Sequence, residues 1–592
     1  MARLEAHHLK YRFSTLYARA NFPLYPLLAL QTVLGAIHLL NILGVSYLHH
    51  VAQRPSNIVT FSLEMDLTPL IFVLSTVTFA LILKRGETQA CIYSAFSGIL
   101  VGLVWGIDLS ASVFALLLPA AALLSLRGVE EYISWFIALM TGFEILVLSH
   151  WAFFTPLGLI SPARPLAELE LALFSLQAPL SPLIALLVIF MWLLKPLLKA
   201  ASGNLSRRFG RGARQLKKRE FSYPTFLPRV LLTSALILAV SAAIYPYAPA
   251  INPEGRPVGV DFYNYIELMD EVDLDLSSAF RVVDGSRPVL LLLIYGLKSI
   301  FHLSTFDAVK YFPAFLNPLL TLTVYFMVHQ AADDRGAAGL ASLFTALGSS
   351  LTVGLYSYFL ANMLALSFTY ASLSFFFKAW KEERPVFLIP SLALASLAVF
   401  THPWMVIHYL TAMVLTMSIL CAKFIVIGMY KRELVLTSTY IAVTGLVFLL
   451  KTSMFGGIRS LSAAFGAGSQ LPCAAEFWGN VMFGFSYLYG GALSNPLLLG
   501  LAAIGVYILG VGTLPRTFFY ALLASSSLYY LVSDGMMMSR IIYNIPFCAF
   551  AGLGALYMLK NFQIKDRTKT VLSAYAVSNL LVYLFRSLAT FV

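Results

Sequence analysis

The chain has 592 residues, 59% of them hydrophobic, and its mean hydropathy is +0.80. Apolar runs of about 17–25 residues, the length that a helix needs to cross a bilayer, recur from end to end. These features exclude a soluble globular protein, and the runs lack the alternation of barrel strands, so we predict an all-α, polytopic membrane protein. The net charge of +12 does not indicate nucleic-acid binding, because most basic residues fall in short loops between apolar runs.

The first third of the chain is predicted to form a module of six transmembrane helices. Its basic N-terminal tail is expected inside the cell, and the apolar run after it is too long for the core of a cleavable signal. The six helices are predicted at residues 22–48, 67–83, 90–107, 109–126, 132–154 and 173–197. Glu144 and His38 lie within two of them. Because burying a charge in a membrane is costly, both are functional candidates, although they can equally pair with each other.

A basic stretch separates this module from the rest of the chain. Residues 199–220 contain seven Arg and Lys residues from Arg207 to Arg219, which is typical of a cytoplasmic segment at an anionic lipid surface. A partner-binding site is the less favoured interpretation of this charge. We therefore predict an N-terminal module at 1–198, a cytoplasmic linker at 199–224 and a second transmembrane module at 225–592.

The second module is predicted to begin with a helix at 226–247 that runs outward into a loop at 248–288. Residues 289–302 are apolar but short, and they either lie along the membrane surface or cross it. A surface segment gives a consistent positive-inside pattern for every later loop. With that choice the chain has about 17 transmembrane helices. The later helices are predicted at 311–330, 337–358, 360–377, 385–400, 404–428, 434–450, 497–514, 518–532 and 541–559, followed by a last one.

The loop at 248–288 is the most acidic part of the chain, and we interpret it as the rim of an active site on the non-cytoplasmic side. Asp261 follows Gly259, whose backbone permits the close approach of a ligand. Asp270 with Glu271, and Asp273 with Asp275, have the spacing of metal-binding pairs. The carboxylates of this loop are Asp261, Glu267, Asp270, Glu271, Asp273, Asp275 and Asp284.

Other polar residues are predicted on the same side of the membrane. They include His402, in the sequence Thr401-His402-Pro403-Trp404, the long loop at 454–495, Asp534 and Arg540. A carboxylate, an imidazole and a guanidinium suit transfer from a lipid phosphate, because a carboxylate acts as a base or metal ligand and Arg binds phosphate with two hydrogen bonds.

From about residue 226 to the C-terminus, the chain resembles the GT-C class of membrane glycosyltransferases. The resemblance rests on Gly259-Val260-Asp261-Phe262-Tyr263 in the first outer loop, Ser286-Arg287-Pro288 before the surface segment, Asp333-Asp334-Arg335-Gly336 between two helices, and Arg540 followed by Tyr543 and Pro546. It implies a catalytic role for Asp261 and binding of a polyprenyl-linked phosphate by Arg540, with Arg287 as a second phosphate ligand.

The chain also departs from that class. Many members carry a second carboxylate in the next outer turn, where this chain has Tyr358-Phe359-Leu360-Ala361-Asn362. The requirement for a divalent cation, Mg²⁺ or Mn²⁺, is therefore open, and Asp261 would be its ligand. The Trp-Trp-Asp signature of oligosaccharyltransferases is absent, which favours transfer of a single sugar or a small lipid-linked unit.

Each candidate residue also has a purely structural interpretation. Asp261 could cap a helix or stay solvated, the paired acids could lie on an exposed helix, His402 could cap a helix, and Arg540 could extend from the interface to water. Two other functions remain as alternatives. One is a transporter or lipid-linked glycan flippase, in which Glu144 and His38 would couple transport. The other is a non-catalytic scaffold of a glycan-assembly complex, which would not need Asp261.

Overall fold

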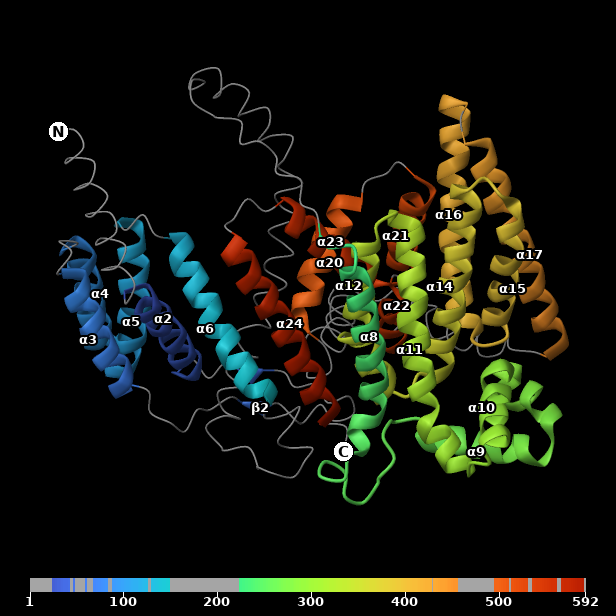
Figure 1. The fold of residues 1–592 in the computed structure, drawn as a ribbon, viewed down its shortest axis with the longest axis horizontal. Coiled ribbons are helices and arrows are strands. Elements are labelled where there is room, and N and C mark those ends of the chain that lie inside the picture. The colour runs from blue at the N-terminus through green and yellow to red at the C-terminus, as the bar shows by residue number, and fades with distance from the viewer. Residues whose placement is uncertain are drawn as a thin grey trace. The chain divides into compact units, whose positions relative to one another are not determined.

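A computed structural model of the chain describes residues 24–42, 46–47, 59–60, 68–83, 88–125, 129–149, 223–428, 430–455, 495–509, 513–530, 535–561 and 566–589 (Figure 1). These residues are helical apart from short connections and strands β1 (Ser46–Tyr47) and β2 (Val59–Thr60), which pair antiparallel. The all-α prediction is therefore confirmed. The predicted helix at 173–197, the basic stretch at 199–220, most of the loop at 454–495, and Asp534 lie outside the described residues.

The chain divides into two compact units. The first comprises residues 1–49, 54–179 and 563–582, and the second comprises 50–53, 180–562 and 583–592. The first unit contains α2 (Leu24–Ile42), α3 (Thr68–Leu83), α4 (Thr88–Trp105), α5 (Ile107–Ser125), α6 (Val129–Ser149) and most of α24 (Asp566–Ala589). Five of the six predicted N-terminal helices thus form close to their predicted positions. The predicted module boundaries at 198 and 225 stay predictions. We predicted α24 as part of the second module, at 225–592, whereas most of α24 lies in the first compact unit.

Glu144 lies in α6 of the first unit, where only 2% of its surface is exposed. Its Oε1 accepts a hydrogen bond of 2.8 Å from Nδ2 of Asn579 in α24. His38 of α2 is also buried, with 4% exposed. The amide of Asn579 provides a structural reason for the buried carboxyl, and the pairing of Glu144 with His38 stays a prediction.

The second unit contains the predicted outward helix α8 (Leu227–Ile244) and the helices that follow it. In chain order these are α9 (Phe262–Leu274), α10 (Pro288–Phe301), α11 (Thr305–Ala332), α12 (Arg335–Ala346), α13 (Ser349–Tyr356), α14 (Leu360–Lys381), α15 (Leu388–Val399), α16 (Pro403–Ile427), α17 (Lys431–Phe455), α20 (Pro496–Leu509), α21 (Leu514–Tyr530), α22 (Gly535–Asn544) and α23 (Phe547–Asn561). Short 3-10 helices occupy Tyr245–Tyr247, Leu276–Phe280, Val282–Gly285 and Pro385–Phe387.

Among the described residues, six helical segments are long and apolar enough to cross a membrane, as expected of a multi-pass membrane protein. They are Leu227–Tyr247, Thr305–Ala332, Arg335–Tyr356, Leu360–Lys381, Pro403–Val426 and Lys431–Phe455. Large apolar side chains such as Ile425, Val426 and Leu449 are exposed on α16 and α17, as a lipid-facing surface requires. The predicted total of about 17 transmembrane helices stays a prediction.

Two predicted helices are interrupted. The helix predicted at 337–358 is split into α12 and α13 around Leu347 and Gly348, and the helix predicted at 541–559 is split into α22 and α23. The second break occurs at Pro546, which cannot donate the backbone hydrogen bond that a continuing helix needs. Arg540 therefore lies within a short helix, α22, and not in a loop before a transmembrane helix as we predicted.

The helices of the second unit pack through buried hydroxyl groups and glycine contacts. The Ser372 hydroxyl of α14 donates to the Ser391 carbonyl oxygen of α15 at 2.7 Å and lies 3.0 Å from the Tyr440 hydroxyl of α17. In α20, a Cβ at Gly505 would lie 1.8 Å from the Phe550 carbonyl oxygen of α23. Close backbone approach at small residues and polar contacts between helices are the usual means of packing in membranes.

The residues between α8 and α11 form a small helical layer in the second unit. Figure 1 shows α9 and α10, in green, beside the N-terminal end of α11. With 14 residues, α10 is about 21 Å long, which is shorter than the hydrocarbon core of about 30 Å. This length is compatible with a surface segment at 289–302, which stays a prediction because α20, in a predicted transmembrane helix, has 14 residues as well. The acidic segment that we predicted as a loop is largely helical, and most of its carboxylates lie on α9.

Candidate functional site

The segment before α9 is held against the turn between α13 and α14. The Val260 N–H donates to the Tyr356 carbonyl oxygen at 2.8 Å. Gly259 has a φ of +111°, and a Cβ there would lie only 2.3 Å from Cδ2 of Tyr358. Tyr358 is buried and itself left-handed, with a φ of 56°, and its hydroxyl donates to the Val309 carbonyl oxygen at 2.7 Å. Glycine is thus required at 259 for both conformation and space, and this contact fixes the position of Asp261.

Asp261 occupies the N-cap position of α9, but its side chain does not cap the helix. Its Oδ1 accepts a hydrogen bond of 3.1 Å from Nδ2 of Asn264 instead. The residue is half-buried. The structural interpretation of Asp261 as a helix cap is therefore wrong, and its second carboxylate oxygen makes no hydrogen bond within the described residues.

Tyr265, one turn along α9, connects this helix to Arg287 and α14. Its buried hydroxyl oxygen accepts hydrogen bonds from Arg287 Nη1 at 3.2 Å and from the Ala361 N–H at 3.4 Å. Burial raises the pKa of Tyr265, and the nearby charge of Arg287 opposes that rise while the charge of Asp261 adds to it. Asp261 and Arg287 are thus both close enough to the Tyr265 hydroxyl to act on it. The turn at 358–362, where many GT-C members carry a second carboxylate, provides the Ala361 N–H to the Tyr265 hydroxyl instead.

His402 is the N-cap residue of α16, as its structural interpretation expected. Its Nδ1 accepts a hydrogen bond of 3.4 Å from the Met405 N–H. Its surroundings lower the pKa of His402 to about 3, first through burial and then through the positive charges of Arg287, Arg540 and Lys451. The imidazole is therefore neutral at physiological pH. With Nδ1 accepting, the ring carries its proton on Nε2 and can donate it to a ligand.

Arg540 lies over an aromatic ring in the same region. Its guanidinium carbon is 5.7 Å from the ring centroid of Phe359, the N-cap residue of α14. The Phe359 ring in turn packs edge-on against Tyr543, with centroids 5.5 Å apart, and the Tyr543 hydroxyl donates to the Ser350 carbonyl oxygen at 2.6 Å. These contacts orient the guanidinium and leave its N–H groups for another partner.

Lys451 is a functional candidate that the sequence did not indicate. It lies near the C-terminal end of α17 and only 1% of its surface is exposed. Among the described residues, neither Lys451 nor Arg287 nor Arg540 forms an ion pair. A buried charge without an opposite charge is costly. Buried Lys451 and the half-buried guanidinium groups of Arg287 and Arg540, whose charges all act on neutral His402, therefore form a site suited to an anion.

The N-terminal ends of α10 and α16, which lie at Arg287 and His402, also favour an anion. Arg287 and His402 are the N-cap residues of α10 and α16, and the Val289 N–H donates to the Phe400 carbonyl oxygen just before α16 at 3.3 Å. The N-terminus of a helix carries a partial positive charge, so it favours an anion. The preference comes from that charge here, because Pro288 and Pro403 have no N–H and the Val289 and Met405 N–H groups already have acceptors. The charges of Arg287, Arg540 and Lys451 thus act on His402, and the charges of Asp261 and Arg287 act on the Tyr265 hydroxyl.

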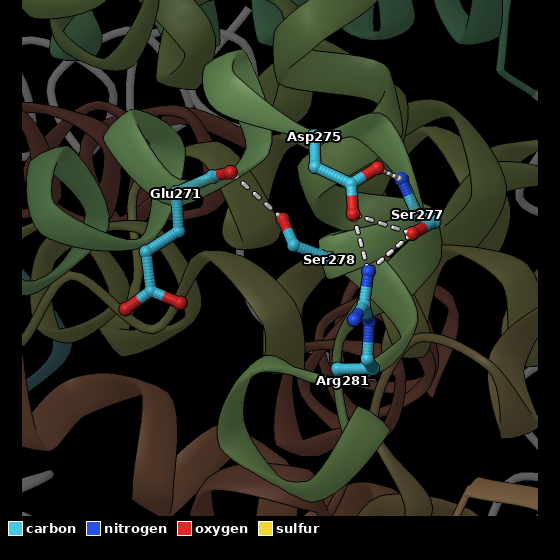
Figure 2. A network of polar contacts seen from close by, with 5 residues as sticks. All are labelled: Glu271, Asp275, Ser277, Ser278 and Arg281. Atoms are coloured by element: carbon cyan, nitrogen blue, oxygen red, sulfur yellow. Dashed lines mark hydrogen bonds and ion pairs between the residues drawn. The ribbon is translucent and has the colours of Figure 1, made fainter.

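Two of the other acidic candidates, Asp273 and Asp275, have structural partners. Asp273 pairs with Lys298 and accepts a hydrogen bond of 3.1 Å from the Thr305 hydroxyl. Figure 2 shows Asp275 accepting hydrogen bonds from Ser277 and Arg281, while the Glu271 side chain points away from this network. The hydrogen bonds from Ser277, together with Arg281, lower the pKa of Asp275. Asp270 and Glu271 are exposed on α9.

A metal site is not evident in the part of the chain that the structure describes. No three His, Cys, Asp or Glu side chains gather there in a group that could hold a metal ion. Asp273 and Asp275 pair with separate cations, Lys298 and Arg281. Their role as a metal-binding pair stays a prediction from their spacing. A divalent cation bound by Asp261 stays a prediction from the sequence.

The Asp333-Asp334-Arg335-Gly336 motif lies at the other end of α11 from these residues. Asp333 is the left-handed C-cap residue of α11. Asp334 is the N-cap of α12, where its Oδ1 accepts from the Gly336 and Ala337 N–H groups at 2.8 and 3.1 Å. The motif therefore ends one helix and starts the next, and it contributes nothing to the candidate site.

Comparison with known proteins does not identify a family for this chain. No protein-family model matches the chain, and no curated protein matches it significantly.

Proposed function

We propose that this chain is a membrane glycosyltransferase that transfers a sugar from a polyprenyl-phosphate donor to an acceptor on the non-cytoplasmic face. The observation that carries the proposal is that the charges of Arg287, Arg540 and Lys451 all act on neutral His402, while none of the three cations has an ion-pair partner among the described residues. A lipid phosphate matches this charge. The resemblance to GT-C glycosyltransferases, which rests on Asp261, Arg287 and Arg540, points to the same chemistry.

In the proposed reaction the phosphate of the donor lies among the three cations. The guanidinium groups of Arg287 and Arg540 bind phosphate oxygens with paired hydrogen bonds, and Nε2 of His402 donates one more. As the bond between the anomeric carbon and the phosphate oxygen breaks, the electron pair of that bond goes to the phosphate. Lys451 and the two guanidinium groups then stabilise the additional negative charge on the lipid phosphate that leaves.

Asp261 is proposed as the general base. Its carboxylate takes the proton of the acceptor hydroxyl while the hydroxyl oxygen forms the new bond to the anomeric carbon. Attack from the side opposite the leaving phosphate inverts the configuration at that carbon. The hydrogen bond from Asn264 and the contact of Gly259 with Tyr358 hold the carboxylate in place.

Binding of the donor tests the phosphate part of this proposal. Purified protein would be titrated with a polyprenyl-phosphate sugar in nanodiscs, and Arg540→Ala is expected to weaken binding by about 2–5 kcal/mol. Arg335→Ala, at the opposite end of the unit, is the matched control and is expected to leave the affinity unchanged. An Arg540→Ala variant that folds normally and binds the donor as wild type does would contradict the proposed site.

A transporter or flippase and a scaffold predict different results. A flippase would bind the same lipid but would not form a glycosidic bond, and a scaffold would do neither. Sugar transfer in liposomes that contain only the purified protein, the donor and an acceptor therefore separates a transferase from the other two functions, and donor binding separates a flippase from a scaffold.

A further inference from the structure

A cavity of about 210 Å³ lies in the second unit between α11, α12, α20, α21 and α23. It is far from the candidate site, because α11 has 28 residues, about 42 Å, and the two lie at its opposite ends. Tyr358 of the candidate site contacts Val309 near the start of α11, whereas the cavity is lined by Val328, Ala331 and Ala332 near its end.

Most of the cavity wall is apolar. Besides the α11 residues, Leu509, Phe519 and Leu553 line it, and among the described residues of the wall Tyr557 alone carries a hydroxyl. The volume is below the range of about 300–1,000 Å³ that is usual for a pocket enclosing a whole small molecule. The cavity is therefore suited to part of an extended apolar group, such as a segment of an acyl chain.

The charged side chains that line the cavity are Arg516, Lys560 and Asp334. Lys560 Nζ donates to Oδ2 of Asp334 at 2.8 Å. Although burial opposes it, the hydrogen bonds from Lys560, Tyr223 and the Ala337 N–H lower the pKa of Asp334, so this pair stays charged. Arg516 is exposed and makes no ion pair within the described residues. One unmatched positive charge therefore remains at this cavity.

Other basic residues lie at the same end of the unit. Lys381 pairs with Asp333, next to Asp334, and Lys423 lies 3.5 Å from the Thr517 hydroxyl, next to Arg516. Basic residues concentrated at one end of a helix bundle mark the cytoplasmic face, and basic pockets between helices on that face bind the headgroups of anionic lipids.

We propose that this cavity binds an anionic phospholipid of the cytoplasmic leaflet. Part of an acyl chain lies between α11 and α23, and the phosphate is bound by Arg516, beside the ion pair of Lys560 with Asp334. The two features of the cavity, an apolar wall and a cationic edge, match the two parts of such a lipid. This site is separate from the donor site and does not depend on the proposed transferase activity.

Native mass spectrometry of the purified, full-length protein tests this proposal. The protein would be released from detergent with equimolar phosphatidylglycerol and phosphatidylcholine of identical acyl chains, and preferential retention of phosphatidylglycerol is expected. Arg516→Gln should weaken that retention about fivefold, the factor that corresponds to about 1 kcal/mol per basic residue. Ala331→Phe, which fills the cavity from half-buried Ala331, should also reduce it. Thermal unfolding of each variant would verify folding.

Lys431→Gln is the matched control, because Lys431 is an exposed basic residue that does not line the cavity. It is expected to retain phosphatidylglycerol as wild type does. Equal retention of the two lipids, or equal retention by Arg516→Gln and Lys431→Gln, would overturn the proposal. Glycerol phosphate is added in a separate arm, and competition by it at the concentration of the lipid would show that a free phosphate is the ligand, which would also overturn it.

Discussion

Gly259 lies against the ring of Tyr358 so closely that a Cβ at residue 259 would be 2.3 Å from Cδ2. Since Tyr358 is buried and its hydroxyl is bonded to the Val309 carbonyl oxygen, the ring has little freedom to move away. The contact holds the segment before α9 onto the turn between α13 and α14, and with it the proposed base, Asp261.

This contact predicts the effect of Gly259→Ala. The strained backbone alone costs about 1–3 kcal/mol, and the clash with Tyr358 adds to it. Asp261 should then move, so sugar transfer is expected to fall strongly while affinity for the donor phosphate changes little. Gly255→Ala is the control, since Gly255 has a φ of +61° but no atom within 4 Å of its Cβ position. Comparable losses in the two variants would mean that strain, and not the contact, is responsible.

Lys451→Met is expected to raise the thermal stability of the protein and to weaken its binding of the donor. Methionine keeps the length of the side chain but removes a buried charge that has no ion-pair partner among the described residues, so the melting temperature is expected to rise. Affinity for a polyprenyl-phosphate donor should fall in the same variant. Lys431→Met, at the exposed start of the same helix, should change neither quantity. A lower melting temperature for Lys451→Met would indicate that the charge has a structural partner.

The pKa of His402 predicts how acid affects the fold. In the unfolded chain a histidine titrates near pH 6.5, whereas in the folded protein the pKa is about 3. Between these values the unfolded state binds more protons, so stability decreases as the pH falls below about 6.5. His402→Asn keeps an N-cap side chain but does not titrate. Its melting temperature should therefore fall less than that of wild type between pH 6.5 and pH 4, and identical slopes would contradict the neutral imidazole.

Much of the fold was predictable from the sequence, because length and hydropathy determine where a helix can lie in a membrane. The helices at 360–377, 404–428 and 434–450 all form, with ends shifted by a few residues. Pro546 indicates the break between α22 and α23, but the residues on both sides of it are apolar, so we predicted one continuous helix at 541–559. Gly348, in the middle of an apolar run, gave an even weaker signal.

The site was predictable only in part. Arg287, His402 and Arg540 were identifiable because each lies at the edge of an apolar run, where a polar residue is noticeable, and Asp261 because it follows Gly259 in the most acidic loop. Lys451 lies at such an edge too, directly after the predicted helix 434–450, but a lysine there usually extends into water. Its burial depends on the packing of α17 against distant segments, which no local pattern records. The ion pairs of Asp273 with Lys298 and Asp275 with Arg281 likewise depend on the tertiary structure.

The most direct test of the proposed transferase is the rate of sugar transfer by Asp261→Asn. Asparagine keeps the size and hydrogen-bonding shape of the side chain but cannot accept the proton. Transfer from a polyprenyl-phosphate donor would be measured in liposomes, with folding verified by thermal unfolding, and Glu267→Gln on the exposed side of α9 would serve as the control. The account predicts a loss of about 10²–10⁴ in rate for Asp261→Asn and a normal rate for Glu267→Gln. Transfer at the wild-type rate by Asp261→Asn would contradict it.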